Sequence, residues 1–161
     1  MALGDIKVLS PAQFGDIGTK KYAVAASATL IYPGEPVAKA LAGTAVTPMA
    51  TNKPVVGTDY LAGIATTTST NTASAAGTVE VMPIVPNVVY TMKPNVATSW
   101  DTQAEYDALV GSRVLIDLTA GSYTILASDG ATYGCVIEPL DIAKNPGVVA
   151  FSFRNGVNYL A

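Results

Sequence analysis

The chain has 161 residues, of which half are hydrophobic and only 13% are charged; its formal net charge is -3, and it contains no histidine. Globular proteins usually carry about 25% charged residues, so an unusually large part of this surface is uncharged. An acidic chain lacks the basic face that binds nucleic acid. The lack of histidine excludes the common Ser-His-Asp and Cys-His catalytic arrangements and imidazole metal sites.

The length suits one domain with one core. Pro, Gly or Thr interrupts every apolar run before it reaches the roughly 18 residues that a membrane span requires. The first residues, MALGDIKVLSPAQFGD, do not have the basic segment followed by an apolar one that marks a secretory signal. We therefore expect a protein made in the cytoplasm that has no membrane partner and whose apolar surface meets protein.

Residues 1–21 are expected to form an N-terminal arm, because Pro11 and three glycines interrupt short apolar pieces such as IKVL. A frayed terminus is one interpretation. The arm is, however, more apolar than a disordered tail needs to be, and ordering against a neighbouring subunit would explain this. The contact residues expected in that case are Ile6, Val8, Leu9, Phe14 and Ile17.

Lys20 and Lys21 are the only local basic pair, and we expect them in a solvated loop. From residue 22 the pattern is that of β-structure. The run YAVAASATLIY ends at a Pro33–Gly34 turn of type II. The segment PVVGTDYLAGIATTT predicts strand, turn and strand.

A long run, GTVEVMPIVPNVVYTM, follows. Pro83 and Pro86 either confine it to a sheet edge or break it, because proline cannot donate to a β-ladder.

An uncharged tract, TTTSTNTASAAG at residues 66–77, joins two of these strands. Its Thr and Ser hydroxyls can bond the backbone of the loop itself. We expect an exposed or intersubunit β-connection that carries no chemistry. Replacing residues 67–75 by a short Gly-Ser turn is then expected to leave the fold intact.

The segment SWDTQAEYDALVGSRV predicts a short helix near residues 102–110. Thr102 and Glu105 have the spacing of a capping box, and Gly111 can supply the left-handed stop. A helix of this length is unstable alone and must pack on the sheet. The apolar face expected to do so comprises Tyr106, Leu109 and Val110.

After the helix, RVLIDL and YTILA are joined by a loop of hairpin length, and two further strands follow Asp-Gly and Asn-Pro-Gly turns. In the last of them Val149, Phe151 and Phe153 alternate with smaller or polar residues, which is typical of a half-buried strand. Many short strands and one small helix predict a mainly β protein. The expected architecture is a small β-barrel or sandwich, with residues 22–161 as a single β-rich domain.

Few residues suggest chemistry. Cys135 has no histidine to activate it and is expected to be a small buried hydrophobe. Glu138 and Asp141 are expected to define a turn rather than to act as an acid and a base, and Asp101 suits the positive end of the helix. No segment has the density of acids that a calcium site needs. We expect no catalysis, cofactor, metal or small-molecule substrate.

The segments IYPGEPVAKA, VVGTDYLAGIATTT and AAGTVEVMPIVPNVVYTM resemble the capsid decoration, or cement, proteins of tailed bacteriophages. The closing EPLDIAKNPGVVAFSFRNGVNYLA also looks like the end of such a virion protein. The resemblance implies a structural protein on the capsid exterior that binds the major capsid protein and itself, as a homotrimer. It would cement neighbouring capsomers, and the arm is its candidate capsid contact.

Two alternatives remain open. One is another virion structural subunit, such as a tail-tube protein. The other is a carbohydrate-binding module, because exposed tyrosines suit sugar and protein contacts. The tyrosines that could serve it are Tyr60, Tyr90, Tyr123 and Tyr133.

Overall fold

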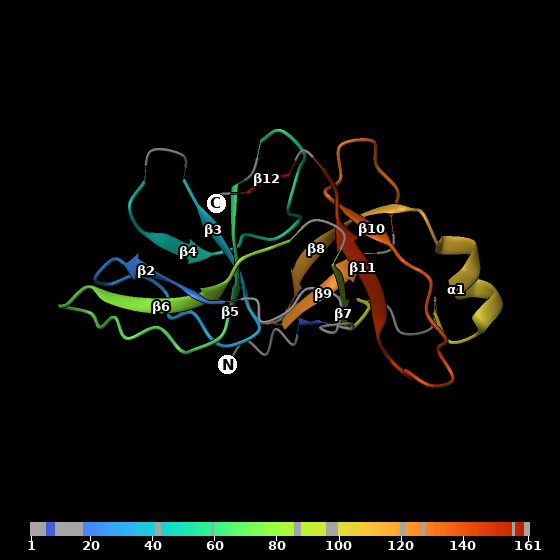
Figure 1. Cartoon of the computed structure of the whole chain (residues 1–161), viewed down its shortest axis with the longest axis horizontal. Coiled ribbons are helices and arrows are strands. Elements are labelled where there is room, and N and C mark those ends of the chain that lie inside the picture. The colour runs from blue at the N-terminus through green and yellow to red at the C-terminus, as the bar shows by residue number, and fades with distance from the viewer. Residues whose placement is uncertain are drawn as a thin grey trace.

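Two β-sheets lie side by side along the long axis of the molecule, and one short helix covers an end (Figure 1). This computed structural model describes residues 6–8, 18–40, 43–58, 60–85, 88–95, 100–119, 122–126, 128–155 and 157–159. The elements in chain order are β1 (Lys7–Val8), β2 (Lys20–Val24), β3 (Pro36–Lys39), β4 (Val46–Pro48), β5 (Tyr60–Ala65), β6 (Gly77–Met82), β7 (Val89–Met92), α1 (Gln103–Leu109), β8 (Arg113–Thr119), β9 (Ser122–Leu126), β10 (Cys135–Ile137), β11 (Val149–Phe153) and β12 (Asn158–Tyr159).

One sheet has the strand order β1-β7-β11-β10-β8-β9, and with α1 it forms what we call the helix lobe. The other has the order β2-β6-β5-β3-β4, with β12 joined to β5, and we call it the hairpin lobe. Neighbouring strands are antiparallel apart from β12, which runs parallel to β5. The predicted mainly β class is confirmed. The sheets do not close into barrels, so the fold is sandwich-like.

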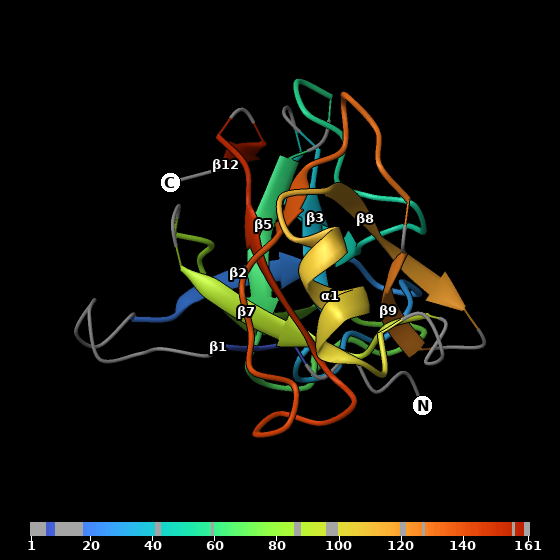
Figure 2. The ribbon, with the colours of Figure 1, turned by 90° about the vertical axis from the view of Figure 1, so that its right-hand side faces the viewer.

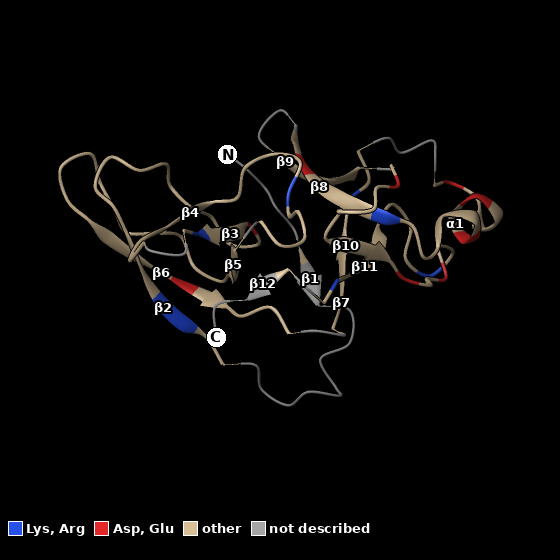
Figure 3. Cartoon of the chain, turned by 90° about the horizontal axis from the view of Figure 1, so that it is seen from above, with Lys and Arg blue, Asp and Glu red and all other residues tan. Residues whose placement is uncertain are grey.

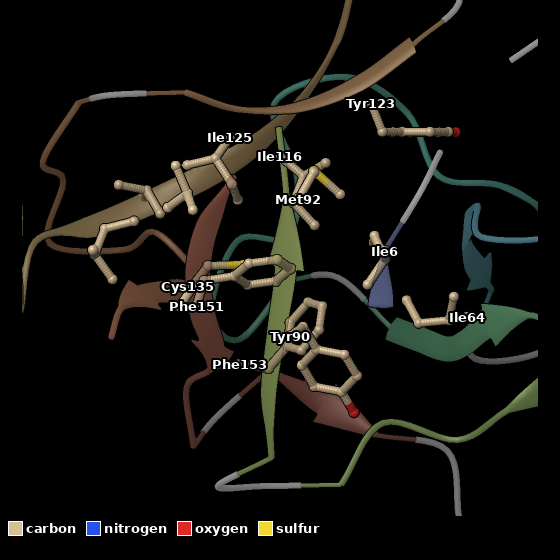
Figure 4. Close-up of a cluster of buried hydrophobic side chains, with 14 of the residues drawn as sticks. Ile6, Ile64, Tyr90, Met92, Ile116, Tyr123, Ile125, Cys135, Phe151 and Phe153 are labelled. Atoms are coloured by element: carbon tan, nitrogen blue, oxygen red, sulfur yellow. The ribbon is translucent and has the colours of Figure 1, made fainter. Parts of the chain in front are cut away.

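The larger hydrophobic core fills the helix lobe and reaches the junction between the lobes (Figure 4). The rings of Tyr90 and Phe153 meet edge to face with 5.3 Å between their centroids, and Phe151 adds a second such contact. Ile6 and Ile64 of β5 extend this cluster toward the hairpin lobe. A smaller core lies inside the hairpin lobe, around Val24, Ile31, Val37 and Val81.

The helix forms as its sequence predicts. Thr102 is the N-cap and both halves of the capping box with Glu105 are present, while Gly111 follows the helix with φ +85°. Tyr106 is buried, so α1 packs on the sheet through this residue. The predicted apolar face is wrong for Val110, which is 37% exposed because the chain leaves the helical conformation at this residue. Figure 1 shows α1 at one end of the molecule, and Figure 2, viewed from that end, shows it facing the viewer.

Several predicted turns and breaks are also confirmed. Gly34 has φ +83° and the Glu35 N–H donates to the Tyr32 carbonyl, as a type II turn requires. Strand β6 ends immediately before Pro83, so the long run breaks there. The predicted first strand of PVVGTDYLAG is instead an irregular connection with isolated bridges at Lys53 and Val55.

The N-terminal boundary differs from the expectation. Residues 7 and 8 form β1, an edge strand beside β7, and β2 already begins at Lys20. Lys20 and Lys21 therefore belong to a strand and not to a loop. Because β2 is an edge of its sheet, exposed lysines there oppose edge-to-edge pairing with other chains.

Candidate interaction surface

Only part of the predicted arm contact lies within the described residues. Ile6 is 6% exposed and packs in the core of its own chain, and its N–H donates to the Gly34 carbonyl at 3.5 Å. Ile6 is therefore not available as an exposed anchor for another protein. Its side chain instead packs in the core at the junction between the lobes. Val8 contributes backbone to β1, whereas Leu9, Phe14 and Ile17 lie outside the described residues.

The two carboxylates considered as an acid and base pair are separate. Glu138 accepts a hydrogen bond from the Ser152 hydroxyl. Asp141 accepts from the Ala143 N–H and pairs with the Lys144 Nζ at 2.9 Å, and this neighbour lowers the pKa of the Asp141 carboxyl. The two side chains line different hollows of the surface. Asp141 organises a turn, as the sequence predicts.

Cys135 is fully buried, as predicted. Burial raises the pKa of its thiol far above the ordinary value, because the thiolate would lose its hydration. The side chain lies beside the aromatic cluster of the helix lobe (Figure 4). It fills space and has no thiolate character at neutral pH.

The four tyrosines do not form an exposed platform. Tyr90 and Tyr123 are buried, and the Tyr123 hydroxyl donates to the Met49 carbonyl at 2.7 Å. Tyr60 and Tyr133 are half-buried in different parts of the chain. A sugar-binding face built from all four is therefore excluded by their burial.

The uncharged tract is the connection of the β5–β6 hairpin, and it folds back along β6. The Thr66 N–H donates to the Glu80 carbonyl and the Thr70 N–H to the Thr78 carbonyl. The hydroxyls supply further acceptors, since Thr67 accepts from the Glu80 N–H and Thr70 from the Thr78 N–H. The tract can thus do without charged side chains, because its own hydroxyls satisfy the backbone.

Two residues of this hairpin are buried and attach it to the segment that follows β2. The Ser69 hydroxyl accepts from the Ile31 N–H at 2.9 Å and donates to the Asn71 Oδ1 at 2.7 Å. The Asn71 amide then donates to the Ala28 carbonyl at 2.8 Å. A Cβ at Gly77 would lie 2.1 Å from the Asn71 backbone nitrogen, so the hairpin packs too closely for any side chain there.

This network changes the expectation for the tract. It is a β-connection as predicted, and its tip is exposed, but it is also part of the hairpin lobe's own structure. The sequence predicted that the Thr and Ser hydroxyls bond to the backbone of the tract itself. That prediction missed the bonds to residues 28 and 31, which lie far away along the chain.

An apolar groove of about 400 Å³ lies beside the start of α1. Trp100, Pro94, Ile142 and Val148 are among the residues that line it, with Lys93 and Asp101 as its charged members. The groove brings together no pair of titratable groups suited to acid and base chemistry. Within the described ranges, no three His, Cys, Asp or Glu side chains gather closely enough to hold a metal ion.

Glu35 is a buried carboxyl that the sequence analysis did not single out. It is 2% exposed, and its Oε2 accepts from the Tyr32 N–H at 3.0 Å within the Pro33–Gly34 turn. Burial raises the pKa of this carboxyl above its ordinary 4.5, and the Tyr32 hydrogen bond offsets only part of this effect. The position of this glutamate directly after a Pro-Gly turn was the sequence feature that could have indicated its hydrogen bond to the turn.

Glu35→Gln is expected to raise the free energy of unfolding at neutral pH. Because the folded-state pKa is the higher one, Glu35 favours folding most below pH 4.5, and this contribution is lost as pH rises through the folded-state pKa. The glutamine side chain keeps a carbonyl for the Tyr32 N–H and carries no charge to desolvate. Urea unfolding across pH should show the variant's advantage growing above pH 4.5.

The control for that experiment is Glu80→Gln, which removes a half-buried carboxylate from β6. A Glu35→Gln variant with the same pH dependence as the wild type would contradict the assignment of a raised pKa.

No helix in the described part of the chain is both long and apolar enough to cross a membrane. No family model, curated protein or solved structure matches this chain.

Proposed function

We propose that this chain is a structural virion protein that binds the outside of a bacteriophage capsid, as a trimer, and cements neighbouring capsomers. One observation carries the proposal. The exposed surface of the hairpin lobe is rich in uncharged Ala, Ser and Thr, and the buried Ser69 and Asn71 form hydrogen bonds within that lobe. The resemblance to decoration proteins supports the same role.

The mechanism in this proposal is association rather than reaction. Low surface charge reduces the desolvation cost of contact, because fewer ions lose water when two surfaces meet. Apolar area contributes about 25 cal/mol per Å² before ordering costs are subtracted. Many copies on one shell would each add a modest stabilisation against internal pressure.

The arm remains the proposed capsid contact, through Leu9, Phe14 and Ile17. Truncating residues 1–20 would be a poor test, because it removes β1 and the buried Ile6. A triple substitution to serine at 9, 14 and 17 keeps residues 6–8 and changes only the proposed anchors.

The experiment is co-sedimentation with expanded capsids of the phage that encodes this chain, prepared without the protein. Wild-type protein is expected to sediment with the capsids and to appear as added density in electron micrographs. Wild-type protein that stays in the supernatant would refute the capsid role. If the triple variant sediments as well as the wild type, the arm is not the contact. A solution mass of six subunits would favour a tail-tube ring instead.

A further inference from the structure

The two lobes differ in charge. Residues 18–82 contain four lysines and three acids, a formal charge of +1, whereas residues 83–161 contain four basic and seven acidic residues, a formal charge of -3. Figure 3 shows the lysines of β2 and the acids of α1 at opposite ends of the molecule. Positive and negative charge are therefore distributed unevenly along the long axis of the molecule.

The acidic end consists of exposed side chains at the start of α1 and on its two flanks, on either side of the buried Tyr106. Asp101, Glu105 and Asp107 are exposed there, and the helix carries no basic residue in its last turn. Elsewhere in the helix lobe Asp129 and Asp141 have basic partners, Arg113 and Lys144. Asp101, Glu105 and Asp107 take part in no ion pair within the described residues, so negative charge gathers around α1.

The basic end is the edge strand β2. Lys20 and Lys21 are exposed, and neither takes part in an ion pair within the described residues. Lys20 lies over the Tyr22 ring, 5.8 Å from its centroid, and Lys21 faces Glu80 across the ladder. Within the described residues, the outer side of β2 makes one isolated bridge, between Ala23 and Ala45.

One large apolar side chain is exposed in each lobe. Among the described residues the large hydrophobic side chains that are exposed are Val110, which ends α1, and Leu30, in the segment after β2. The exposed charges of α1 and of the β2 edge are opposite in sign. Such surfaces fit one another and do not fit themselves.

We propose that copies of this chain associate head to tail, with the exposed acidic side chains around α1 on one copy against the β2 edge of the next. This contact is heterologous, and a heterologous contact closes into a ring when its rotation permits. It rests on the proposed trimer and specifies which surfaces form it. The charges set the orientation and the encounter rate of the two copies.

The test is charge reversal, followed by sedimentation at several protein concentrations. Lys20→Glu and Asp107→Lys are each expected to weaken association about five- to thirtyfold, because an exposed attractive pair becomes a repulsive one. The double variant K20E/D107K is expected to recover wild-type association, since both ends are reversed together. Lys39→Glu is the control, a half-buried lysine on β3 that belongs to neither proposed surface.

Salt supplies a second measurement. Raising NaCl from about 50 mM to about 500 mM should weaken wild-type association and diminish the effect of each reversal. Circular dichroism and urea unfolding should confirm that all four variants fold.

Wild-type protein that is monomeric at every concentration, single reversals without effect, or a double variant that stays weak would each overturn the head-to-tail contact. Capsid co-sedimentation is scored separately. A chain that decorates capsids but fails these tests keeps the proposed function and loses only this interface.

Discussion

Tyr106→Ala is expected to lower the free energy of unfolding by about 3–5 kcal/mol, as large truncations in a core do. Tyr106 is the fully buried residue of α1, and its ring lies 6.0 Å from that of Trp100. Its hydroxyl donates to the Glu138 carbonyl at 2.8 Å and accepts from the Ala150 N–H at 2.9 Å. Alanine removes both the packing and this link, so α1 loses its attachment to the sheet.

Urea unfolding measures the total effect, and Tyr106→Phe separates its two parts. Phenylalanine keeps the ring but leaves a buried N–H without its partner, for which we expect a loss of about 1–3 kcal/mol. Trp100 is the only tryptophan of the chain, so its fluorescence reports on the same site.

Tyr60→Phe is the control, because Tyr60 is only half-buried on β5. We expect it to stay within about 0.5 kcal/mol of the wild type, as surface changes usually do. A Tyr106→Phe variant as stable as Tyr60→Phe would show that the hydroxyl does not hold the helix.

The accuracy of sequence reasoning depends on how far apart the interacting residues are. The helix was predicted down to its caps because the Thr102–Glu105 capping box spans three residues and Gly111 lies immediately beyond the helix. The Pro33–Gly34 turn succeeded for the same reason. Such contacts depend on the local pattern and need no knowledge of the fold.

Predictions failed where the partner lies far along the chain. Residues 54–58 look like a strand, yet the Val56 N–H donates to the Thr132 carbonyl and the Gly134 N–H to the Pro54 carbonyl. These distant bonds place the segment as a connection between the lobes. Ile6 looked like a free anchor because nothing local shows that it packs beside β5 and β7. Tertiary contacts override local propensity in both cases.

For the candidate interaction surface, too, some properties could be predicted from the sequence and others depend on the fold. Composition alone indicated an uncharged surface and no catalytic groups, because these are properties of residue types. The opposition of α1 and β2 could not be read from the sequence, since the two elements are about eighty residues apart. Their separation in space depends on how the lobes pack.

Asn71→Ala is expected to lower the free energy of unfolding by about 1–3 kcal/mol, the cost of leaving buried polar partners unsatisfied. Asn71 is 5% exposed, and alanine deprives both the Ala28 carbonyl and the Ser69 hydroxyl of their bonds. Asn71→Asp separates the contributions of these two hydrogen bonds, because a carboxylate still accepts from the Ser69 hydroxyl but cannot donate to the Ala28 carbonyl.

The exposed Thr68 lies on the same hairpin, and Thr68→Ala is the matched control, with an expected change below about 0.5 kcal/mol. Replacing residues 67–75 by a Gly-Ser turn should then cost more than Asn71→Ala, because it also removes the backbone bonds from Ser27 to Thr72 and from Ser69 to Ile31. This reverses the expectation from sequence, which treated the tract as dispensable for the fold. If the shortened protein and Asn71→Ala both unfold at the wild-type urea concentration, the hairpin contributes nothing to the stability of its lobe. In that case its lack of charge must be explained by assembly alone.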